Sequence, residues 1–339
     1  MAKNKILKNG VWALLAALGL AAGYFLAFYL VPGNKEIPDA EKAGTGKGVL
    51  PDRFKYEIGQ FKSYDKKQVI YREDGSFKTG LKEPYGLAID KKTDLLSVLS
   101  TEAVLVCNDK GVGKMSGLSG KLKMIGPAYI IEGVLSLQEE DKKDFVSGKA
   151  FSFEENGGGD GEFKFVTSVK TDGKYVFIAD AGNRKVYKFD TKGKYLGQIG
   201  KKDKAAGRGF IIPSPCMDMD FDREGNLWVA NTGLLKLEKY SKDGAFLGSW
   251  GEHGVNINEF IGCCNPVSFI IDREDNFITA EKGVVRIKKY DKTGKFLGIV
   301  APPGVFNEKC KSVPLAVDSK NRIYALDTVE KTVRVFTKK

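Results

Sequence analysis

Residues 166–200 read VTSVKTDGKYVFIADAGNRKVYKFDTKGKYLGQIG, and this pattern decides the fold. It returns at 216–251 as CMDMDFDREGNLWVANTGLLKLEKYSKDGAFLGSWG and at 267–301 as VSFIIDREDNFITAEKGVVRIKKYDKTGKFLGIVA. Two further copies begin at Pro84 and Pro314. In each copy, short runs of β-branched and aromatic residues are separated by Gly, Asp and Asn turns, which indicates strands rather than helices. Four strands in a repeat of about 40–50 residues are typical of a β-propeller blade.

One part of the repeat also carries a family resemblance. The segment FIADAGNRKV at 177–186 is similar to the NHL repeat, whose pattern runs Val-Ala-Asp-x-x-Asn-x-Arg-apolar. The resemblance extends over about 68–339 and implies an NHL-type β-propeller. The variant unit with FIGCCNPVSF at 260–269 resembles membrane-anchored bacterial NHL proteins, some of them found in electron-transport settings. That likeness assigns no role to any residue.

The number of blades follows from the spacing of the repeats. An aspartate ends the first strand of four units: Asp90, Asp222, Asp272 and Asp318. Lys170 occupies the equivalent place in the unit at 166–200, so the intervals after it are 52, 50 and 46 residues, but the interval before it is 80. Eighty residues can hold two blades, the second near 125–163. We therefore predict six blades, with seven as the alternative if 54–71 forms a partial unit.

The last unit ends after its third strand. The segment QVIYREDGSFKTGL at 68–81 precedes the first full unit and is suited to supply the missing fourth strand. Such a pairing closes the ring and removes exposed sheet edges. The predicted fold class is all-β, a closed six-bladed propeller.

A membrane helix is predicted before the propeller. Residues 11–31 contain 21 residues without a charge, long enough to cross a hydrocarbon layer about 30 Å thick. A cleaved signal peptide is the alternative, although its apolar region is usually shorter. The predicted organisation is a cytoplasmic stub at 1–10, the helix, a flexible linker at 32–53 and the propeller at 54–339. This organisation places the propeller on the periplasmic or extracellular side of the cytoplasmic membrane.

Composition excludes several functions. The chain has 54 Lys plus Arg and 43 Asp plus Glu, a net charge of +11 spread along its length, and we expect no nucleic-acid partner. The single histidine, His253, excludes a multi-His zinc site, and no Cys-x-x-Cys-His haem motif or phosphate-binding loop occurs. No combination of acid, base and nucleophile is visible, which favours a non-enzymatic protein and leaves an enzyme open.

The cysteines form a candidate site. Four of them precede the first strand of three successive units: Cys216, Cys263, Cys264 and Cys310. They should therefore lie on one face of the propeller. One interpretation is two disulfides that staple blades together, with Cys263 and Cys264 pairing with different partners. The other is a metal or redox site of thiolates, aided by Asp218, and free thiols are the third. Cys107 stands in a third strand and is expected to be buried.

Other residues are expected on the same face, where links between strands commonly bind ligands. The candidates from these links are Asp218, Asn183, Arg184, Asn231, Glu281, Lys282 and Arg286. We expect Arg286 and Arg184 to occupy equivalent places. Asp218 and Asp220 share one side of a strand, so a calcium site or pairing with a basic residue of a neighbouring blade would explain them.

Three functions remain. The first is a membrane-anchored scaffold that binds a protein partner within a membrane complex. The second is a redox or metal-binding protein that uses the cysteines. The third is a metal-dependent lyase or hydrolase using Asp218, Asp220 and His253, which the shortage of histidines disfavours.

Overall fold

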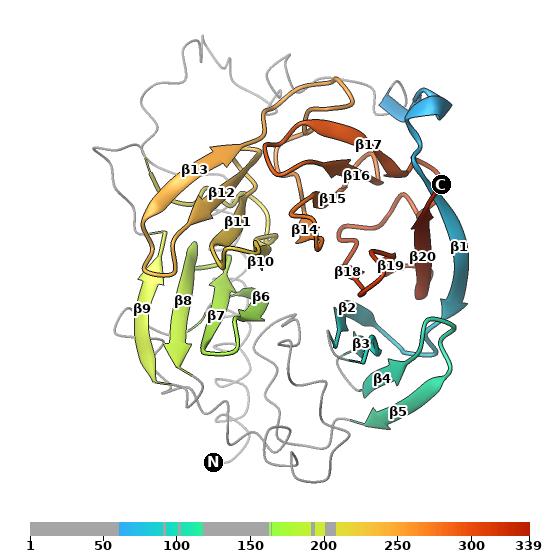
Figure 1. The fold of residues 1–339 in the computed structure, drawn as a ribbon, viewed down its shortest axis with the longest axis horizontal. Coiled ribbons are helices and arrows are strands. Elements are labelled where there is room, and N and C mark those ends of the chain that lie inside the picture. Colours follow the sequence, from blue (N-terminus) through green and yellow to red (C-terminus); the bar gives the residue numbers. More distant parts are fainter. Residues whose placement is uncertain are drawn as a thin grey trace, which may run out of the picture. The chain divides into compact units, whose positions relative to one another are not determined.

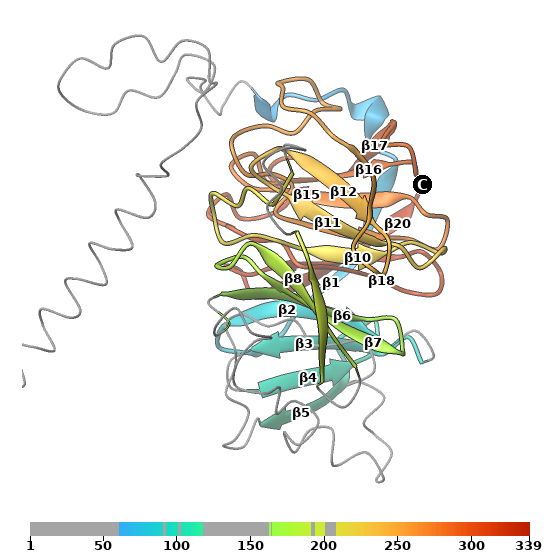
Figure 2. The same cartoon turned by 90° about the vertical axis from the view of Figure 1, so that its left-hand side faces the viewer.

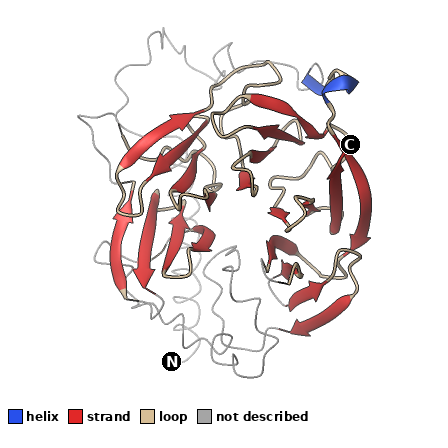
Figure 3. Cartoon of the chain, in the orientation of Figure 1, coloured by secondary structure: helices blue, strands red, loops and turns tan. Residues whose placement is uncertain are grey.

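The computed structural model describes residues 61–90, 93–100, 103–117, 163, 165–190, 194–200 and 208–339. These residues form an all-β propeller with five blades around a common axis (Figure 1). Each blade is an antiparallel sheet of four strands. Strands dominate the described chain, as Figure 3 shows, and a short 3-10 helix, Lys66–Gln68, precedes the first of them.

Four blades are each built from one continuous stretch of chain. The first in sequence contains β2 (Pro84–Ile89), β3 (Leu96–Ser100), β4 (Ala103–Cys107) and β5 (Gly113–Gly117). The second contains β6 (Val166–Thr171), β7 (Tyr175–Asp180), β8 (Lys185–Asp190) and β9 (Tyr195–Ile199). The third contains β10 (Met219–Phe221), β11 (Leu227–Asn231), β12 (Lys236–Tyr240) and β13 (Phe246–Trp250). The fourth contains β14 (Ser268–Ile271), β15 (Phe277–Glu281), β16 (Arg286–Tyr290) and β17 (Phe296–Ala301).

The fifth blade joins two distant parts of the chain. Its strands are β18 (Leu315–Val317), β19 (Ile323–Asp327), β20 (Thr332–Lys338) and β1 (Tyr71–Lys78). β1 runs antiparallel to β20, with Tyr71 opposite Lys338 and Lys78 opposite Thr332. The predicted fourth strand within 68–81 is therefore confirmed. This pairing covers the outer edge of β20, which would otherwise expose its backbone hydrogen-bonding groups.

The number of blades corrects the prediction of six. The described residues contain five four-stranded sheets, and the segment near 125–163 assigned to a hidden blade lies almost wholly outside them. The prediction depended on the 80-residue interval before Lys170, and an interval gives a length of chain rather than a set of paired strands. The described part of 54–71 supplies no blade of its own, so the seven-bladed alternative fails as well.

The predicted membrane helix lies outside the residues that the structure describes. In the part of the chain that the structure describes, no helix is long and apolar enough to cross a membrane. Segment 11–31, the stub at 1–10 and the linker at 32–53 lie outside the described residues.

Apolar side chains pack between neighbouring blades in the described part of the propeller. Figure 2 shows the blades from the side, with the β6–β9 and β10–β13 blades next to one another. Between the β10–β13 and β14–β17 blades, Trp228 and Phe277 meet edge to face, with ring centroids 4.8 Å apart. Trp250 packs against Phe277 and Tyr290 in the same cluster. Burial of each large side chain contributes about 1.5–3 kcal/mol, so this interface is a firm support for the loops above it.

Two kinds of link share one face of the propeller. The incoming link leads from the fourth strand of one blade to the first strand of the next, and another link joins the second and third strands. In the β10–β13 blade, the N–H of Gly233 from the β11–β12 link donates to the carbonyl of Ile211 in the incoming link at 2.7 Å. In the β6–β9 blade, Ala181 donates to Phe165 in the same way at 2.8 Å. We call this side the loop face.

Candidate thiol site

The incoming link of the β14–β17 blade carries two adjacent cysteines. Gly262 before them has φ +84°, a left-handed conformation that glycine adopts without the clash of a Cβ atom. The chain turns there, so that Cys263 is exposed to solvent and Cys264 is only 5% exposed. The local sequence Ile-Gly-Cys-Cys-Asn therefore offers one accessible sulfur and one sheltered sulfur.

Asn265 fastens this link to the β15–β16 link. Its side-chain Nδ2 donates to the carbonyl of Ile261 at 2.7 Å and to the carbonyl of Lys282 at 3.1 Å. The N–H of Lys282 donates back to Asn265 Oδ1 at 2.9 Å. Asn265 is 2% exposed, so these bonds are sheltered from water. They fix the backbone of Lys282 beside the cysteines.

Side-chain contacts then connect two neighbouring blades. The Sγ atoms of Cys263 and Cys264 lie 3.4 Å apart. Ser214, in the incoming link of the β10–β13 blade, accepts a hydrogen bond from Lys282 Nζ at 2.7 Å. The Ser214 hydroxyl also lies 3.5 Å from Cys216 Sγ. We call these five residues the thiol site.

The surroundings of Cys264 favour its thiolate. A hydrogen bond from the Cys263 thiol is the largest influence on Cys264, and together with the Lys282 ammonium and the Ser214 hydroxyl it lowers the pKa of Cys264 to about 5, against burial, which raises it. The pKa of Cys263 is raised, first because its thiol donates to Cys264 and second because it is partly buried. The thiolate is the nucleophilic form of cysteine. The site therefore pairs a nucleophilic sulfur with a protonated neighbour.

Cys216 is a second protonated thiol at the edge of the site. Burial is the main cause that raises the pKa of Cys216, and the negative charges of Cys264 and Asp218 raise it further. Ser214 and Lys282 lower the pKa, each by less than burial raises it but by more than Cys264 or Asp218 does. Cys216 is only partly exposed.

The structure brings together three of the four predicted cysteines and not the fourth. Cys310 is buried, and its thiol donates to Asp327 Oδ1 at 3.2 Å. All five cysteines of the chain are free thiols, so the predicted disulfide staples are not formed. The expectation that Cys263 and Cys264 face different partners is also wrong, because their sulfurs face each other. The position of a residue within a link determines on which face of the propeller it lies. It does not determine in which direction the side chain points.

A metal site is not visible in the described part of the chain, where no three His, Cys, Asp or Glu side chains converge to hold an ion. Cys107 is buried in β4, and burial raises its pKa to about 11. His253 is exposed in the loop after β13, and its backbone forms a bridge with Phe260.

Asp218 and Asp220 bind the backbone of the next blade. Asp218 Oδ2 accepts the N–H of Phe269 at 3.0 Å, and Asp220 Oδ2 accepts the N–H of Ile271 at 2.8 Å. Lys170, from the blade on the other side, lies 3.4 Å from Asp220. Burial raises the pKa of Asp218, and the charge of Lys170 opposes the rise. These contacts account for both carboxylates as links between the inner strands, without a calcium ion.

Asn183, Arg184 and Asn231 have local roles in their links. Asn231 is fully buried, and its Oδ1 accepts the N–H of Ile211 at 2.8 Å, which holds the incoming link. Asn183 donates to Asp180 Oδ2 at 2.9 Å within the β7–β8 link. Arg184 is exposed and has φ +57° at the turn before β8.

The predicted equivalence of Arg286 and Arg184 is wrong. Arg286 lies opposite Glu281 in the β15–β16 register, where Lys185 lies opposite Asp180 in the β7–β8 register. Arg286 is 3% exposed, and its Nε donates to Glu281 Oε2 at 3.1 Å. Glu281 is fully buried. Both residues therefore lie below the loop face rather than on it.

Two residues of this region escaped the sequence analysis. Ser214 links Lys282 to Cys216, and a serine in a Pro-Ser-Pro segment has no distinctive signal. Lys288 is fully buried in β16. A signal for it was present, because a lysine at a strand position that faces the interior is rare.

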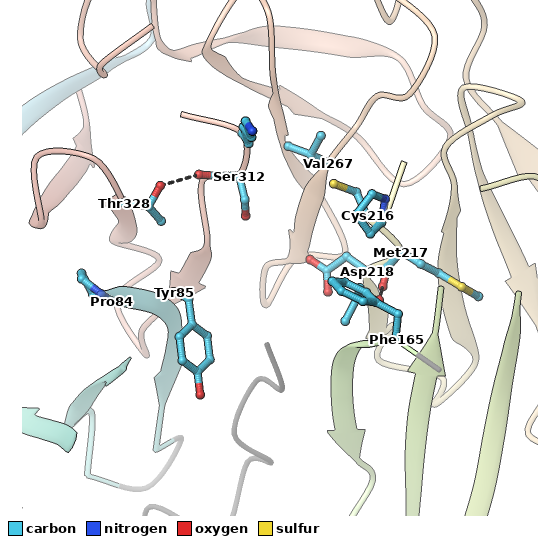
Figure 4. A pocket seen from close by; sticks show the side chains of 12 residues that line it. Pro84, Tyr85, Phe165, Cys216, Met217, Asp218, Val267, Ser312 and Thr328 are labelled. Carbon is cyan, nitrogen blue, oxygen red and sulfur yellow. Dashed lines mark hydrogen bonds between the residues drawn. The ribbon is translucent and has the colours of Figure 1, made fainter. Parts of the chain in front are cut away.

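A cavity of about 250 Å³ opens at the axis beside Cys216 (Figure 4). All five blades contribute to its lining, which includes Tyr85, Phe165, Cys216, Asp218, Val267 and Thr328. Figure 4 shows Cys216 and Asp218 on one side of this space and Tyr85 and Thr328 on the other. Burial raises the pKa of Tyr85 to about 12. The lining is mainly apolar, with the Cys216 thiol at its edge.

Comparison with known proteins yields structural likenesses only. No protein-family profile matches the chain, and no curated protein matches its sequence, so membership of the NHL class stays a prediction. A streptogramin B lyase structure is 9% identical with a TM-score of 0.43, covering 79% of this chain and 98% of that one. Myxococcus xanthus glutaminyl cyclase is 9% identical with a TM-score of 0.44, covering 79% and 95%.

A third likeness is to a catalytically inactive virginiamycin B lyase from Staphylococcus aureus, solved with quinupristin. It is 10% identical with a TM-score of 0.37, covering 75% of this chain and 66% of that one. Similarity at this level carries no argument about activity or site residues.

Proposed function

We propose that this propeller carries out thiol–disulfide exchange on its loop face, with Cys264 as the attacking thiolate and Cys263 as the second thiol. The observation that carries the proposal is the 3.4 Å contact between the two sulfurs beside the Lys282 ammonium. A thiolate attacks disulfides, whereas a protonated thiol does not. The exposure of Cys263 gives a substrate access to the pair.

The exchange proceeds in two steps. The Cys264 thiolate attacks one sulfur of a substrate disulfide, a mixed disulfide forms, and the other substrate sulfur leaves as a thiolate. Cys263 then loses its proton to solvent and attacks Cys264 Sγ, and the second substrate sulfur leaves. Two cysteines are thereby oxidised to a disulfide while one substrate disulfide is reduced to two thiols. In reverse, the same steps oxidise a substrate dithiol.

Two physical arguments favour the oxidising direction. A stabilised thiolate favours the reduced form of the protein, which makes its disulfide a strong oxidant. Adjacent residues also have Cα atoms only about 3.8 Å apart, less than the roughly 4.4–6.8 Å usual for disulfides. A Cys263–Cys264 disulfide is therefore strained and easily reduced. A substrate dithiol would supply the two electrons.

The test is the pH dependence of alkylation, read cysteine by cysteine. The purified chain is treated with iodoacetamide between pH 3 and 9, and modified peptides are quantified by mass spectrometry. Cys264 should react with a midpoint near pH 5. Cys310→Ser is the matched control, because it removes a thiol from an equivalent link and should leave this midpoint unchanged. A midpoint near the ordinary value of about 8.5 would contradict the proposal.

The redox step is tested separately. Titration with mixtures of reduced and oxidised glutathione should produce a reversible Cys263–Cys264 disulfide, which Cys264→Ser abolishes. A disulfide that instead joins Cys216 to Cys264 would assign Cys216 as the second thiol and overturn that part of the proposal.

A second candidate function is that of a protein-binding scaffold, which one observation supports. Three links of the loop face expose apolar side chains, with exposed fractions of 41% for Ile211, 38% for Leu234 and 40% for Val329. Contiguous apolar patches are typical of a protein interface, and Ile211 and Leu234 lie in two links that are hydrogen-bonded to each other. A partner that copurifies with the chain should be lost from Ile211→Glu with Leu234→Glu and retained by Cys264→Ser. The opposite result would favour the thiol chemistry alone.

A further inference from the structure

A buried lysine contacts the link that carries the paired cysteines. Lys288 is fully buried in β16, and its Nζ donates to the carbonyl of Glu259 at 2.7 Å and to that of Ile257 at 3.1 Å. It also contacts the Glu281 carboxylate. The rings of Phe260 and Tyr290 flank the ammonium, with centroids 4.9 and 5.3 Å away. A buried ammonium is costly unless its donors are matched, and here three acceptors surround it.

A second side chain of β16 binds Asn258, the residue between Ile257 and Glu259. The Tyr290 hydroxyl donates to the carbonyl of Asn258 at 3.1 Å. Two side chains of β16 thus bind three consecutive carbonyls of the incoming link, at residues 257–259. Cys263 follows Glu259 by four residues in the same link, and Cys264 follows it by five. This anchor therefore fixes the backbone position from which the chain leads to the two sulfurs.

Lys288 also reaches the other half of the site. Glu281, which it contacts, is the residue before Lys282. Arg286 holds the same carboxylate, with Nη2 3.0 Å from Oε2. Lys288 therefore connects the incoming link, which contains Cys264, to the β15–β16 link, which contains Lys282.

The neighbouring blade shows that this anchor is not a general feature of the repeat. Glu238 stands at the place of Lys288, and Tyr240 at the place of Tyr290. Glu238 accepts from Asn231 Nδ2 at 2.9 Å and from the Tyr240 hydroxyl. In that blade Asn231, from the second strand, holds the incoming link through the N–H of Ile211 and the carbonyl of Gly209. Link carbonyls bound by a lysine and a tyrosine of the third strand are seen in the blade that carries the paired cysteines.

We propose that Lys288 and Tyr290 are positioning residues for Cys264, holding its link so that the sulfur meets the Lys282 ammonium. This inference rests on the proposed function, because it explains how the thiolate of that reaction is maintained. Neither residue touches the reacting sulfurs. Their effect passes through the backbone of 257–264 and through Glu281.

The test compares Lys288→Met and Tyr290→Phe with the wild-type chain. The alkylation midpoint of Cys264 should rise by about one pH unit in Lys288→Met and by a smaller amount in Tyr290→Phe, since a displaced link weakens the contact of the thiolate with the Lys282 ammonium, and an opposite charge nearby commonly shifts a pKa by about 1–3 units. Amide hydrogen exchange of 257–264 should become faster in both. Tyr240→Phe is the matched control, because it removes one tyrosine hydroxyl from the neighbouring blade and should leave the midpoint of Cys264 unchanged.

The outcomes separate this inference from the proposed function. A wild-type midpoint near pH 8.5 contradicts the proposed function before any variant is compared. A wild-type midpoint near 5 that persists in folded Lys288→Met and Tyr290→Phe overturns the positioning role alone. If Lys288→Met does not fold, Tyr290→Phe decides, because it keeps the ring and the buried charges.

Discussion

The β10–β13 and β14–β17 blades share one backbone pattern but hold their incoming links with different side chains. Asn231 lies opposite Lys236 in one register, as Glu281 lies opposite Arg286 in the other. In the first blade the buried pair is Asn231 with Glu238, and its neutral amide holds both an N–H and a carbonyl of the incoming link. In the second, Glu281 pairs with a lysine that holds carbonyls.

This difference shows how a repeat acquires a site. The fold fixes the positions that face the incoming link, but the residues at those positions decide which backbone groups are bound and which charges lie beneath the link. In the β14–β17 blade, the link between the second and third strands carries the cation Lys282, which lies near the Cys264 thiol. In the β10–β13 blade the same position is Thr232, whose hydroxyl donates to the carbonyl of Cys216 at 3.2 Å.

The largest expected contrast between the two blades is in stability. Glu281→Gln should lower the free energy of unfolding by about 3–5 kcal/mol, because it leaves Lys288 and Arg286 as buried cations without their carboxylate. Glu238→Gln should cost only about 1 kcal/mol, because its partners Asn231 and Tyr240 are neutral and an amide oxygen still accepts from them. Urea unfolding followed by tryptophan fluorescence measures both. Equal losses would show that the charge reversal has no energetic consequence.

The next contrast is in thiol reactivity. Lys282→Thr gives the link the residue of the preceding blade and removes the ammonium near Cys264, so the pKa of Cys264 should rise by about 1–3 units. The alkylation midpoint measures this shift. Lys311→Thr, which changes an exposed lysine of the same face, is the control and should move it little. If both variants shift the midpoint equally, the general positive charge of the face is responsible and not Lys282.

The last expected contrast is in the pH dependence of stability, where the effect is spread over several pH units. The pKa of Cys264 falls from an ordinary value of about 8.5 to about 5 on folding, so between these values the unfolded chain binds up to one proton more than the folded chain. Stability from this group therefore rises with pH across that window, by at most about 1.4 kcal/mol per pH unit, and is lost below pH 5. Cys264→Ser should flatten the slope by that amount. If the slope is unchanged in Cys264→Ser, then Cys264 is not the group whose pKa falls on folding.

Much of the fold could be predicted from the sequence because its signals are local. Strand runs, turn aspartates and the closing strand at 68–81 all follow from patterns of neighbouring residues. The turn aspartates are one example: Asp222 Oδ1 accepts the N–H of Asn226 at 2.8 Å, and Asp272 Oδ1 accepts that of Asn276 at 2.9 Å. The blade count was less predictable, because a long interval does not reveal which strands pair.

The site was predicted only in part for a similar reason. The repeat places Cys216, Cys263 and Cys264 on one face, and the departure from the usual repeat at Glu281 and Lys282 indicates an unusual blade. Side-chain direction, however, depends on contacts far apart in sequence. Asp327 draws the thiol of Cys310 into its own blade, and Lys282 reaches Ser214 across 68 residues of chain.

The pairing of β1 with β20 has a consequence for biosynthesis. The fifth blade cannot be completed until β20 has been synthesised, although β1 is the first strand of the described chain. Domains generally fold as units, and here the first strand finds its partner only when the last strand has been made. The propeller is therefore completed only after synthesis has reached the end of β20.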